Sequence, residues 1–289
     1  MKIQNLINEG GKELKKNNIS SYVLDSEILL SKIMNKDRKY LILNPGKEVE
    51  NEKLIIFKKF IYQRSLGKPI AYILKKKEFW KNEFIVSNDV LIPRPDTEVM
   101  IEAILKICNH KKKLRILDIG VGSGCIILSI LKEKKDFYGI GIDVSKKCVD
   151  LSRKNTSKLN LDNRAKIFKS DIDNFNYGKY DLVVSNPPYI NRVDLKKLDK
   201  DVRMFEPKLA LDGGLDGLYE IRKVIEKSSK LLKKNGKLII EIAYDQKNRV
   251  CKMLTLRGYY INKILKDYAL KDRCIVCTKL WIKKLNGNF

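Results

Sequence analysis

The spacing of hydrophobic residues separates the beginning of the chain from the rest. Up to about residue 75, apolar residues recur every three or four positions, as Ile3, Leu6 and Ile7 do. This period predicts helices that each bury one face. Pro45-Gly46 interrupts the pattern and separates the second predicted helix from the third. Residues 1–75 are therefore expected to form a small helical bundle, with a structural or substrate-docking role and no catalytic constellation of its own.

Residues 76–92 are expected to form a β-hairpin that links the bundle to the rest of the chain. Apolar and polar residues alternate on both sides of Lys81-Asn82, which is the pattern of a short hairpin. A proline-rich segment follows and stiffens the chain ahead of a predicted helix at 99–108. Arg94 in this segment is a fixed cation, and the sequence leaves open whether it forms a surface ion pair or contacts a ligand.

From Leu114 onward, short apolar runs alternate with amphipathic segments. Such alternation predicts a mostly parallel sheet covered by helices. Residues 93–289 are therefore expected to form one α/β domain, interrupted by a long irregular loop at 194–217. The predicted strands are residues 115–119, 138–142, 165–168, 180–185 and 238–242, with a closing antiparallel pair at 259–265 and 274–281.

The composition allows a full hydrophobic core but does not identify a partner. Hydrophobic residues make up 44% of the 289 residues, which is enough for a large domain and a small one. Lysine and arginine number 60 against 35 acidic residues, a net charge of +25. This charge fits a nucleic-acid or ribonucleoprotein partner, and a proteome-wide lysine bias would produce it equally well. Charge alone therefore does not establish nucleic-acid binding.

The cysteines and the single histidine argue against a metal site, so no metal is expected. His110 lies in a polar run that is typical of a surface loop. Cys274 and Cys277 are spaced as C-x-x-C, but residues three apart on a strand point to opposite faces, so we expect buried thiols. Free thiols, no signal peptide and no apolar run long enough to span a membrane indicate a cytoplasmic protein without a membrane partner.

The segment Asn186-Pro187-Pro188-Tyr189 is the strongest candidate for chemistry. Two prolines cannot continue a central strand, so the strand that ends near Ser185 stops in a stiff, extended turn. Ligands of open α/β sheets bind at this end of the strands. The Asn186 side chain and the Pro187 backbone each offer a carbonyl acceptor, and together they can take both hydrogens of a planar NH₂ group. With Tyr189 stacked on its plane, the turn predicts a site that grips an amide or amino nitrogen.

A glycine-rich turn and two acidic strand ends complete the predicted site. Gly120, Gly122 and Gly124 follow a strand and open a helix, where free N–H groups and the lack of side chains let a ligand approach. Their spacing is not that of dinucleotide-binding proteins, and no phosphate-loop lysine follows. Asp143 can accept hydrogen bonds from a ribose diol, and Asp171 from an adenine amino group. Because these strand ends open on one crevice, they predict a cofactor site.

Together these residues resemble those of a class I S-adenosylmethionine-dependent methyltransferase. More narrowly, the chain resembles the release factor glutamine methyltransferases, the HemK/PrmC family. The resemblance implies an α/β fold: a class I methyltransferase Rossmann-like sheet with a small N-terminal helical bundle and a linking hairpin. The most specific match is Leu91-Ile92-Pro93-Arg94-Pro95-Asp96-Thr97-Glu98, and the others are Gly67–Tyr72, Glu78-Phe79-Trp80, Asn186–Tyr189, Phe205-Glu206-Pro207 and Ala210-Leu211.

The resemblance also implies a reaction. A methyl group would pass from S-adenosylmethionine to the glutamine of the Gly-Gly-Gln motif in class I peptide-chain release factors, giving N5-methylglutamine and S-adenosylhomocysteine. Asn186, Pro187 and Tyr189 would be catalytic, and these three with Pro188 would bind the substrate. We expect the enzyme to be a monomer. The residues assigned to the cofactor are Asp118, Gly120, Gly122, Gly124, Asp143, Asp171 and Asn186.

Two alternatives remain open. A nucleic-acid methyltransferase acting on adenine N6 or guanine N2 would use the same grip and would suit the net charge of +25. No RNA-binding module or target-recognition domain is recognisable, so nucleic acid is not expected as the direct substrate. A non-catalytic cofactor-binding factor is the second alternative, and such a protein would have no use for an intact Asn186-Pro187-Pro188-Tyr189.

Overall fold

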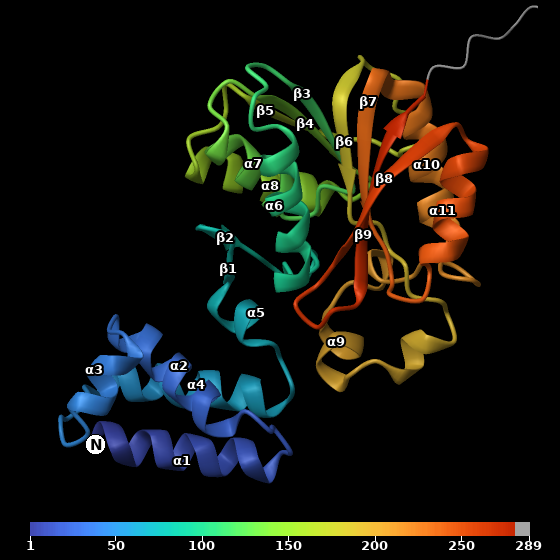
Figure 1. The fold of residues 1–289 in the computed structure, drawn as a ribbon. Helices are drawn as coiled ribbons and strands as arrows, with labels where there is room; N and C mark the ends of the chain where they lie inside the picture. Colours follow the sequence, from blue (N-terminus) through green and yellow to red (C-terminus); the bar gives the residue numbers. More distant parts are fainter. Residues whose placement is uncertain (281–289) are drawn as a thin grey trace, which may run out of the picture. The chain divides into compact units, whose positions relative to one another are not determined.

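The computed structural model describes residues 1–280, which divide into two compact units. The helical unit consists of Met1–Lys76 together with Asp199–Phe205, and the sheet unit contains Lys77–Leu198 and the chain from Glu206 onward. Figure 1 shows both units in colours that follow the sequence. The last predicted strand, 274–281, ends at Trp281, which lies outside the described residues.

Five helices from the first part of the chain build most of the helical unit, as their hydrophobic period predicts. Their apolar faces meet in one core, in which Leu6, Leu29 and Phe57 are almost completely buried. The helices are α1 (Ile3–Lys16), α2 (Tyr22–Met34), α3 (Arg38–Leu43), α4 (Asn51–Ser65) and α5 (Ile70–Leu74).

Helix α9 (Lys200–Phe205) belongs to the same unit although it lies far along the chain. The expectation of an irregular loop is therefore wrong for this segment. The buried guanidinium of Arg64 gives the physical reason, because it lies 2.6 Å from the carboxylate of Asp25 and 2.7 Å from that of Asp201. Hydrophobic periodicity gives no sign of such a long-range ion pair.

Within the described residues, the sheet unit holds a seven-stranded sheet in the order β5-β4-β3-β6-β7-β9-β8. The first five of these strands are parallel to one another, β9 is antiparallel to β7, and β8 is antiparallel to β9. The last two strands thus form the predicted closing antiparallel pair. β7 begins at Leu232 rather than at the predicted Leu238, because Leu232 pairs with Tyr180 of β6. The strands are β3 (Arg115–Ile119), β4 (Tyr138–Asp143), β5 (Ala165–Lys169), β6 (Tyr180–Ser185), β7 (Leu232–Glu241), β8 (Tyr259–Lys266) and β9 (Asp272–Lys279).

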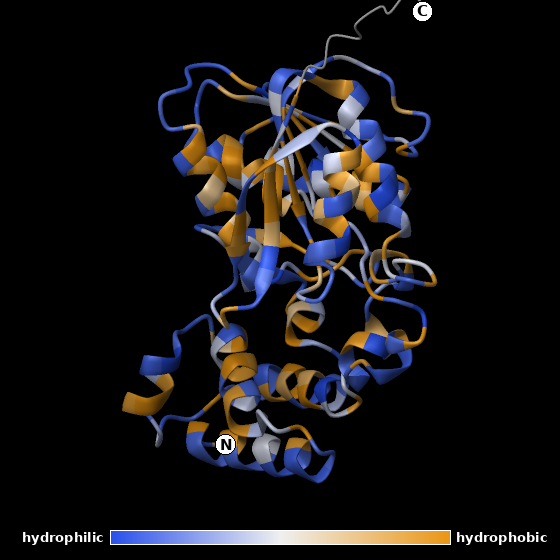
Figure 2. Ribbon diagram, turned by 45° about the vertical axis from the view of Figure 1, so that its right-hand side comes forward, coloured by the Kyte–Doolittle hydropathy of each residue, from blue (hydrophilic) through white to orange (hydrophobic). Residues whose placement is uncertain are grey.

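Helices cover both faces of the sheet, so its central strands are apolar on both sides (Figure 2). Alternate residues of β3 serve different cores: Ile116 belongs to one, and Leu117 and Ile119 belong to the other. Phe79 and Phe84 of the predicted hairpin are buried in the first core. The hairpin consists of β1 (Lys76–Phe79) and β2 (Asn82–Ile85). Three helices contribute to the first core: α6 (Glu98–Ile107), α7 (Cys125–Glu133) and α8 (Lys146–Lys158). Two helices contribute to the second core: α10 (Tyr219–Leu231) and α11 (Lys247–Leu256).

The order of the strands opens a crevice in the sheet unit. After β3 the chain moves outward through β4 to β5, and then it crosses back to place β6 on the other side of β3. Ile119 and Ser185 are register partners at the carboxyl ends of β3 and β6. The loops that leave these two strands therefore diverge from adjacent points, which is where open α/β sheets bind their ligands.

Gly10 and Gly11 on α1 offer a matched test of the helical packing. A Cβ at Gly10 would lie 2.7 Å from Ser26 Oγ and 2.8 Å from Phe57 Cζ, whereas a Cβ at Gly11 would lie 3.6 Å from its nearest neighbour. We expect Gly10→Ala to lower the free energy of unfolding by about 1–3 kcal/mol, because it overpacks the core. Gly11→Ala should raise it by up to about 1 kcal/mol through helix propensity. Urea unfolding measures both, and effects of the same sign would contradict this packing.

Candidate active site

A cavity of about 440 Å³ lies at the carboxyl ends of the parallel strands. Its volume is in the range of small-molecule sites. The crossover between β5 and β6 gathers around it residues that are far apart in the sequence. The predicted site residues that line it are Gly120 and Gly122 after β3, Asp143 at the end of β4, Asp171 after β5, and Asn186, Pro187 and Pro188 after β6.

The glycine turn after β3 presents bare backbone to the cavity. Gly120 has a φ of +76°, and a Cβ built on it would meet no atom within 4 Å. Its N–H and that of Val121 both donate to the carbonyl oxygen of Ile142, at 2.9 Å each. The turn is thus held in place by β4 while its open side is left to a ligand.

Two carboxylates face the cavity from the next strands. Asp143 accepts the backbone N–H of Gly122 at 3.0 Å and that of Ser145 at 2.9 Å. Burial raises the pKa of Asp143, and these two hydrogen bonds oppose the shift. Asp171 accepts the N–H of Asp173 at 2.7 Å and lies 3.9 Å from the ammonium of Lys223. Each carboxylate oxygen has more than one lone pair, so both side chains can still accept bonds from a ligand.

Three of the predicted site residues do not line the cavity: Asp118, Gly124 and Tyr189. A Cβ on Gly124 would lie 2.6 Å from Ser152 Oγ, so this glycine permits close packing of α7 against α8. Asp118 is fully buried beneath the glycine turn, and its Oδ2 accepts the N–H of Ile127 at 3.3 Å. Burial raises the pKa of Asp118 to about 7. Asp118 and Gly124 therefore support the turn from behind.

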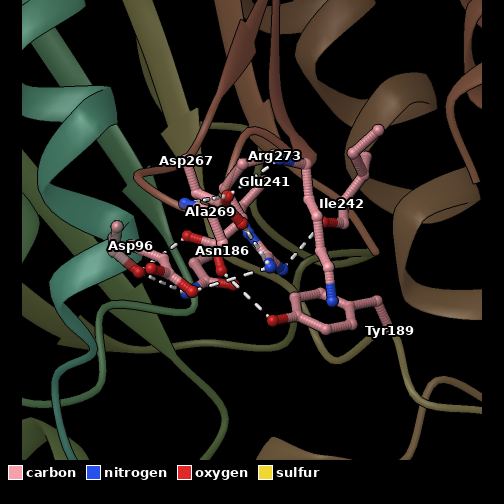
Figure 3. Close-up of polar contacts among 10 residues, drawn as sticks. Asp96, Asn186, Tyr189, Glu241, Ile242, Asp267, Ala269 and Arg273 are labelled. Atoms are coloured by element: carbon pink, nitrogen blue, oxygen red, sulfur yellow. Dashed lines mark hydrogen bonds and ion pairs between the residues drawn. The ribbon is translucent and has the colours of Figure 1, made fainter. Parts of the chain in front are cut away.

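A hydrogen-bonded chain leads from the Asn186 turn into the protein. Asn186 Nδ2 donates to Thr97 Oγ1 at 3.2 Å, and Thr97 Oγ1 donates to Glu241 Oε2 at 2.7 Å. The hydroxyl of Tyr189 donates to the other oxygen, Oε1, of Glu241 at 3.2 Å. Figure 3 shows Asn186, Glu241 and Tyr189 pointing toward one another. One carboxylate thus connects the two ends of the Asn186-Pro187-Pro188-Tyr189 segment.

Glu241 is only 1% exposed, and burial raises its pKa to about 7. The bonds from Thr97 and Tyr189 and the positive charge of Arg273 oppose that shift. Arg273 itself lies 2.8 Å from the buried carboxylate of Asp267, which shares its charge.

The sequence patterns did not single out Thr97 or Glu241 as site residues. Glu241 ends an apolar strand, as Asp143 does, and this position was a signal that could have found it. Thr97 lies in the proline-rich segment, whose match to the family assigns it no role. Arg94 of the same segment forms an ion pair with the buried Glu206. The structure thus supports the ion-pair interpretation of Arg94, although Glu206 makes it a partly buried pair rather than a surface one.

Among residues 1–280, no three His, Cys, Asp or Glu side chains come together as a metal site. All six cysteines are free thiols. Cys274 and Cys277 are buried in different cores, on opposite faces of the sheet, so the prediction for this pair is confirmed. In the same part of the chain, no helix combines the length and the hydropathy that a membrane span needs.

Comparison with known proteins agrees with this geometry. Residues 5–74 match the family described as the PrmC N-terminal domain, and residues 95–206 match the methyltransferase small domain. The release factor glutamine methyltransferase of Clostridium acetobutylicum is 39% identical over 282 residues, covering 96% of this chain and 99% of that protein. A bifunctional methyltransferase of Rickettsia bellii is 34% identical over 94% of this chain, which spans only 54% of that longer protein.

Solved structures show the same fold at lower sequence similarity. The ribosomal protein L11 methylase of Lactobacillus delbrueckii subsp. bulgaricus superposes with a TM-score of 0.51 at 16% identity. The alignment covers 71% of this chain and 90% of that one. The likeness confirms the methyltransferase fold class of the sheet unit predicted from the sequence.

Burial of Asp118 predicts how stability depends on pH. A carboxyl whose pKa is higher in the folded state binds its proton more readily when folded, so the free energy of unfolding falls as pH rises from about 4 to about 7. In Asp118→Asn this fall should be smaller by about 2–4 kcal/mol, because no charge is buried at that position. Urea unfolding between pH 5 and pH 8 measures the difference. Asp150→Asn, on the exposed face of α8, is the control, and a wild-type pH profile in Asp118→Asn would contradict the expectation.

Proposed function

The chain belongs to the release factor glutamine methyltransferase family, and we propose that it transfers a methyl group from S-adenosylmethionine to N5 of the glutamine in the Gly-Gly-Gln motif of peptide-chain release factors. One observation supports the assignment most strongly. Asn186 and Pro187 line the same cavity as Gly120 and Asp143, so the predicted amide grip and the predicted cofactor site share one space. The remaining expectations, a monomer that acts in the cytoplasm, are part of the same proposal.

The Asn186 turn is suited to a glutamine amide. An amide nitrogen is a poor nucleophile because its lone pair is delocalised, so placement matters more than a strong base. Thr97 engages the NH₂ end of Asn186 and leaves its carbonyl oxygen available to the substrate. That oxygen and the Pro187 carbonyl would accept the two hydrogens of the glutamine NH₂ group and aim its nitrogen into the cavity.

The same two carbonyl groups would stabilise the transition state. Positive charge develops on the glutamine nitrogen as its bond to the methyl carbon forms and the sulfur–carbon bond breaks. The negative ends of the two carbonyl dipoles already point at this nitrogen, so they oppose the charge without reorganising. One N–H proton then passes to water, which leaves N5-methylglutamine and S-adenosylhomocysteine.

The residues along β3, β4 and β5 fit S-adenosylmethionine, which supplies an electrophilic methyl group on a sulfonium. We propose that Asp143 accepts from the ribose hydroxyls and Asp171 from the adenine amino group. The bare backbone at Gly120 and Gly122 would accept the close approach of the methionine part, since no Cβ stands in the way at Gly120. Asp118 and Gly124 would act indirectly, by fixing the shape of the glycine turn.

The proposed reaction is tested by methyl transfer from labelled S-adenosylmethionine to a purified release factor. We expect label on the intact factor and none when the Gly-Gly-Gln glutamine is replaced, because the site is built for one amide nitrogen. Bulk RNA and DNA are assayed in parallel, since the net charge of +25 favours a nucleic-acid amino methyltransferase as the second candidate. Label on nucleic acid, with none on the factor, would contradict the proposed substrate and support the nucleic-acid amino methyltransferase.

Asn186→Ala should lower the rate of transfer by about 10²–10³-fold, because it removes one of two preorganised acceptors. Binding of S-adenosylmethionine, measured by calorimetry, should persist in this variant. Asp143→Ala is the matched contrast, and we expect it to weaken cofactor binding. Near-normal turnover of Asn186→Ala would exclude the amide grip as the catalytic device.

A further inference from the structure

We infer that Glu241 is a positioning residue for methyl transfer, which acts through Thr97 to keep the carbonyl end of Asn186 toward the substrate. The inference rests on the proposed function and deepens it. It assigns a task to a side chain that has no contact with the cavity itself.

The geometry places Glu241 at the centre of the site's support. It ends β7, the strand beside β6, and its two oxygens receive hydrogen bonds from different segments (Figure 3). Oε2 accepts from Thr97, which precedes α6, and Oε1 accepts from Tyr189, which follows β6. Thr97 is 2% exposed and Glu241 is 1% exposed, so water does not compete for these bonds.

The charge of Glu241 sets the donor and the acceptor of each hydrogen bond that links Asn186, Thr97 and Tyr189 to it. An ionised carboxylate can only accept hydrogen bonds, so the hydroxyl of Thr97 must donate its single hydrogen to Glu241. The oxygen of Thr97 is then left with lone pairs alone, and it can only accept from Asn186. The Asn186 side chain must therefore present its NH₂ end to Thr97 and its carbonyl end to the cavity. The amide orientation thus follows from the carboxylate and needs no other partner.

A neutral side chain at this position would remove the constraint. The NH₂ group of a glutamine could donate to Thr97, which would free the threonine hydroxyl to donate to Asn186. Asn186 could then turn its NH₂ group to the cavity, where it would face the NH₂ group of the substrate. Two donors cannot bond to each other, so this orientation would be unproductive.

The surroundings of Glu241 allow its charge to change near neutral pH. Burial raises its pKa to about 7, against the opposing effects of Thr97, Arg273 and Tyr189. Above that value the carboxylate is ionised and the network has one direction, and below it the protonated carboxyl can donate. We therefore expect the transfer rate to rise with pH through about 7. Asp96 favours the neutral form, and the other titratable groups that interact with Glu241 are Tyr189, Arg273, Cys125 and Cys274.

The test compares Glu241→Gln with the wild type in the release-factor assay across pH. We expect kcat of the variant to fall by about 10²-fold at pH 8, as misplacement of a catalytic group does. The loss should appear in kcat more than in the KM for release factor, and the affinity for S-adenosylmethionine should stay unchanged, because Glu241 does not line the cavity. The rise of kcat through pH 7 should disappear. Glu226→Gln, in the partly exposed part of α10, serves as the charge-matched control.

Thr97 provides a second pair of variants. Thr97→Ser keeps the hydroxyl and should retain most of the transfer activity. Thr97→Val keeps the shape of the side chain but has no hydroxyl, and its kcat should fall as that of Glu241→Gln does. A merely structural role would make the melting temperature of Glu241→Gln fall together with kcat. We expect instead that this variant melts no lower than the wild type at pH 8, since it no longer buries a charge.

The outcomes separate this inference from the proposed function. A wild type that transfers no methyl group to release factor would overturn the proposed function. With an active wild type, a kcat in Glu241→Gln close to normal, or an unchanged pH profile, would overturn the positioning role. NMR of protein labelled with ¹³C-glutamate and ¹⁵N-asparagine provides a readout without turnover. We expect a glutamate carboxyl signal that titrates near pH 7 and is absent from Glu241→Gln, and a side-chain amide signal of Asn186 that shifts over the same pH range. An Asn186 signal that ignores this titration would also overturn the inference.

Discussion

Parallel pairing of β3 with β6 is the constraint on which the rest of the site depends. The register of Ile119 with Ser185 ends both strands at the same level, so the glycine turn and the Asn186 turn begin side by side. Helices pack on both faces of this pair, and its interior residues are almost completely buried. Loops that leave a rigid scaffold inherit its precision, which suits a reaction that depends on placement.

The sheet unit contains buried carboxyl groups at positions where apolar residues would give a more stable fold. Asp118 and Glu241 are 0% and 1% exposed, and both have a raised pKa because burial disfavours their charged form. Neither contacts the cavity, yet each stands one step behind a turn that does. Their positions suggest that stability has been given up for orientation, at the two turns on which the proposed chemistry relies.

Local signals explain what could be predicted from the sequence. The period of the hydrophobic residues distinguishes the helices of the first unit from the strands of the second. Because ligands of open α/β sheets bind at the carboxyl ends of the strands, the residues that follow the strands could be selected, and Gly120, Asp143, Asp171 and Asn186 do line one cavity. Each of these inferences needs only a few neighbouring residues. Glu241 and Thr97 are 144 positions apart in the sequence, and Arg64 and Asp201 are 137 apart. No local pattern therefore predicts these contacts, which form only in the folded protein. The hydroxyl of Tyr189 likewise points to Glu241, a direction that no local pattern contains.

The return of Asp199–Phe205 to the helical unit affects how far the chain can be treated as modular. The covalent chain passes between the two units three times, at Lys76–Lys77, Leu198–Asp199 and Phe205–Glu206. The segment that matches the PrmC N-terminal domain, residues 5–74, includes Arg64 but not its partner Asp201. A chimera joined to a relative near residue 75 would therefore combine a guanidinium from one parent with the α9 carboxylate of the other. Recombination by whole domains would preserve this pair only if both parents carry it.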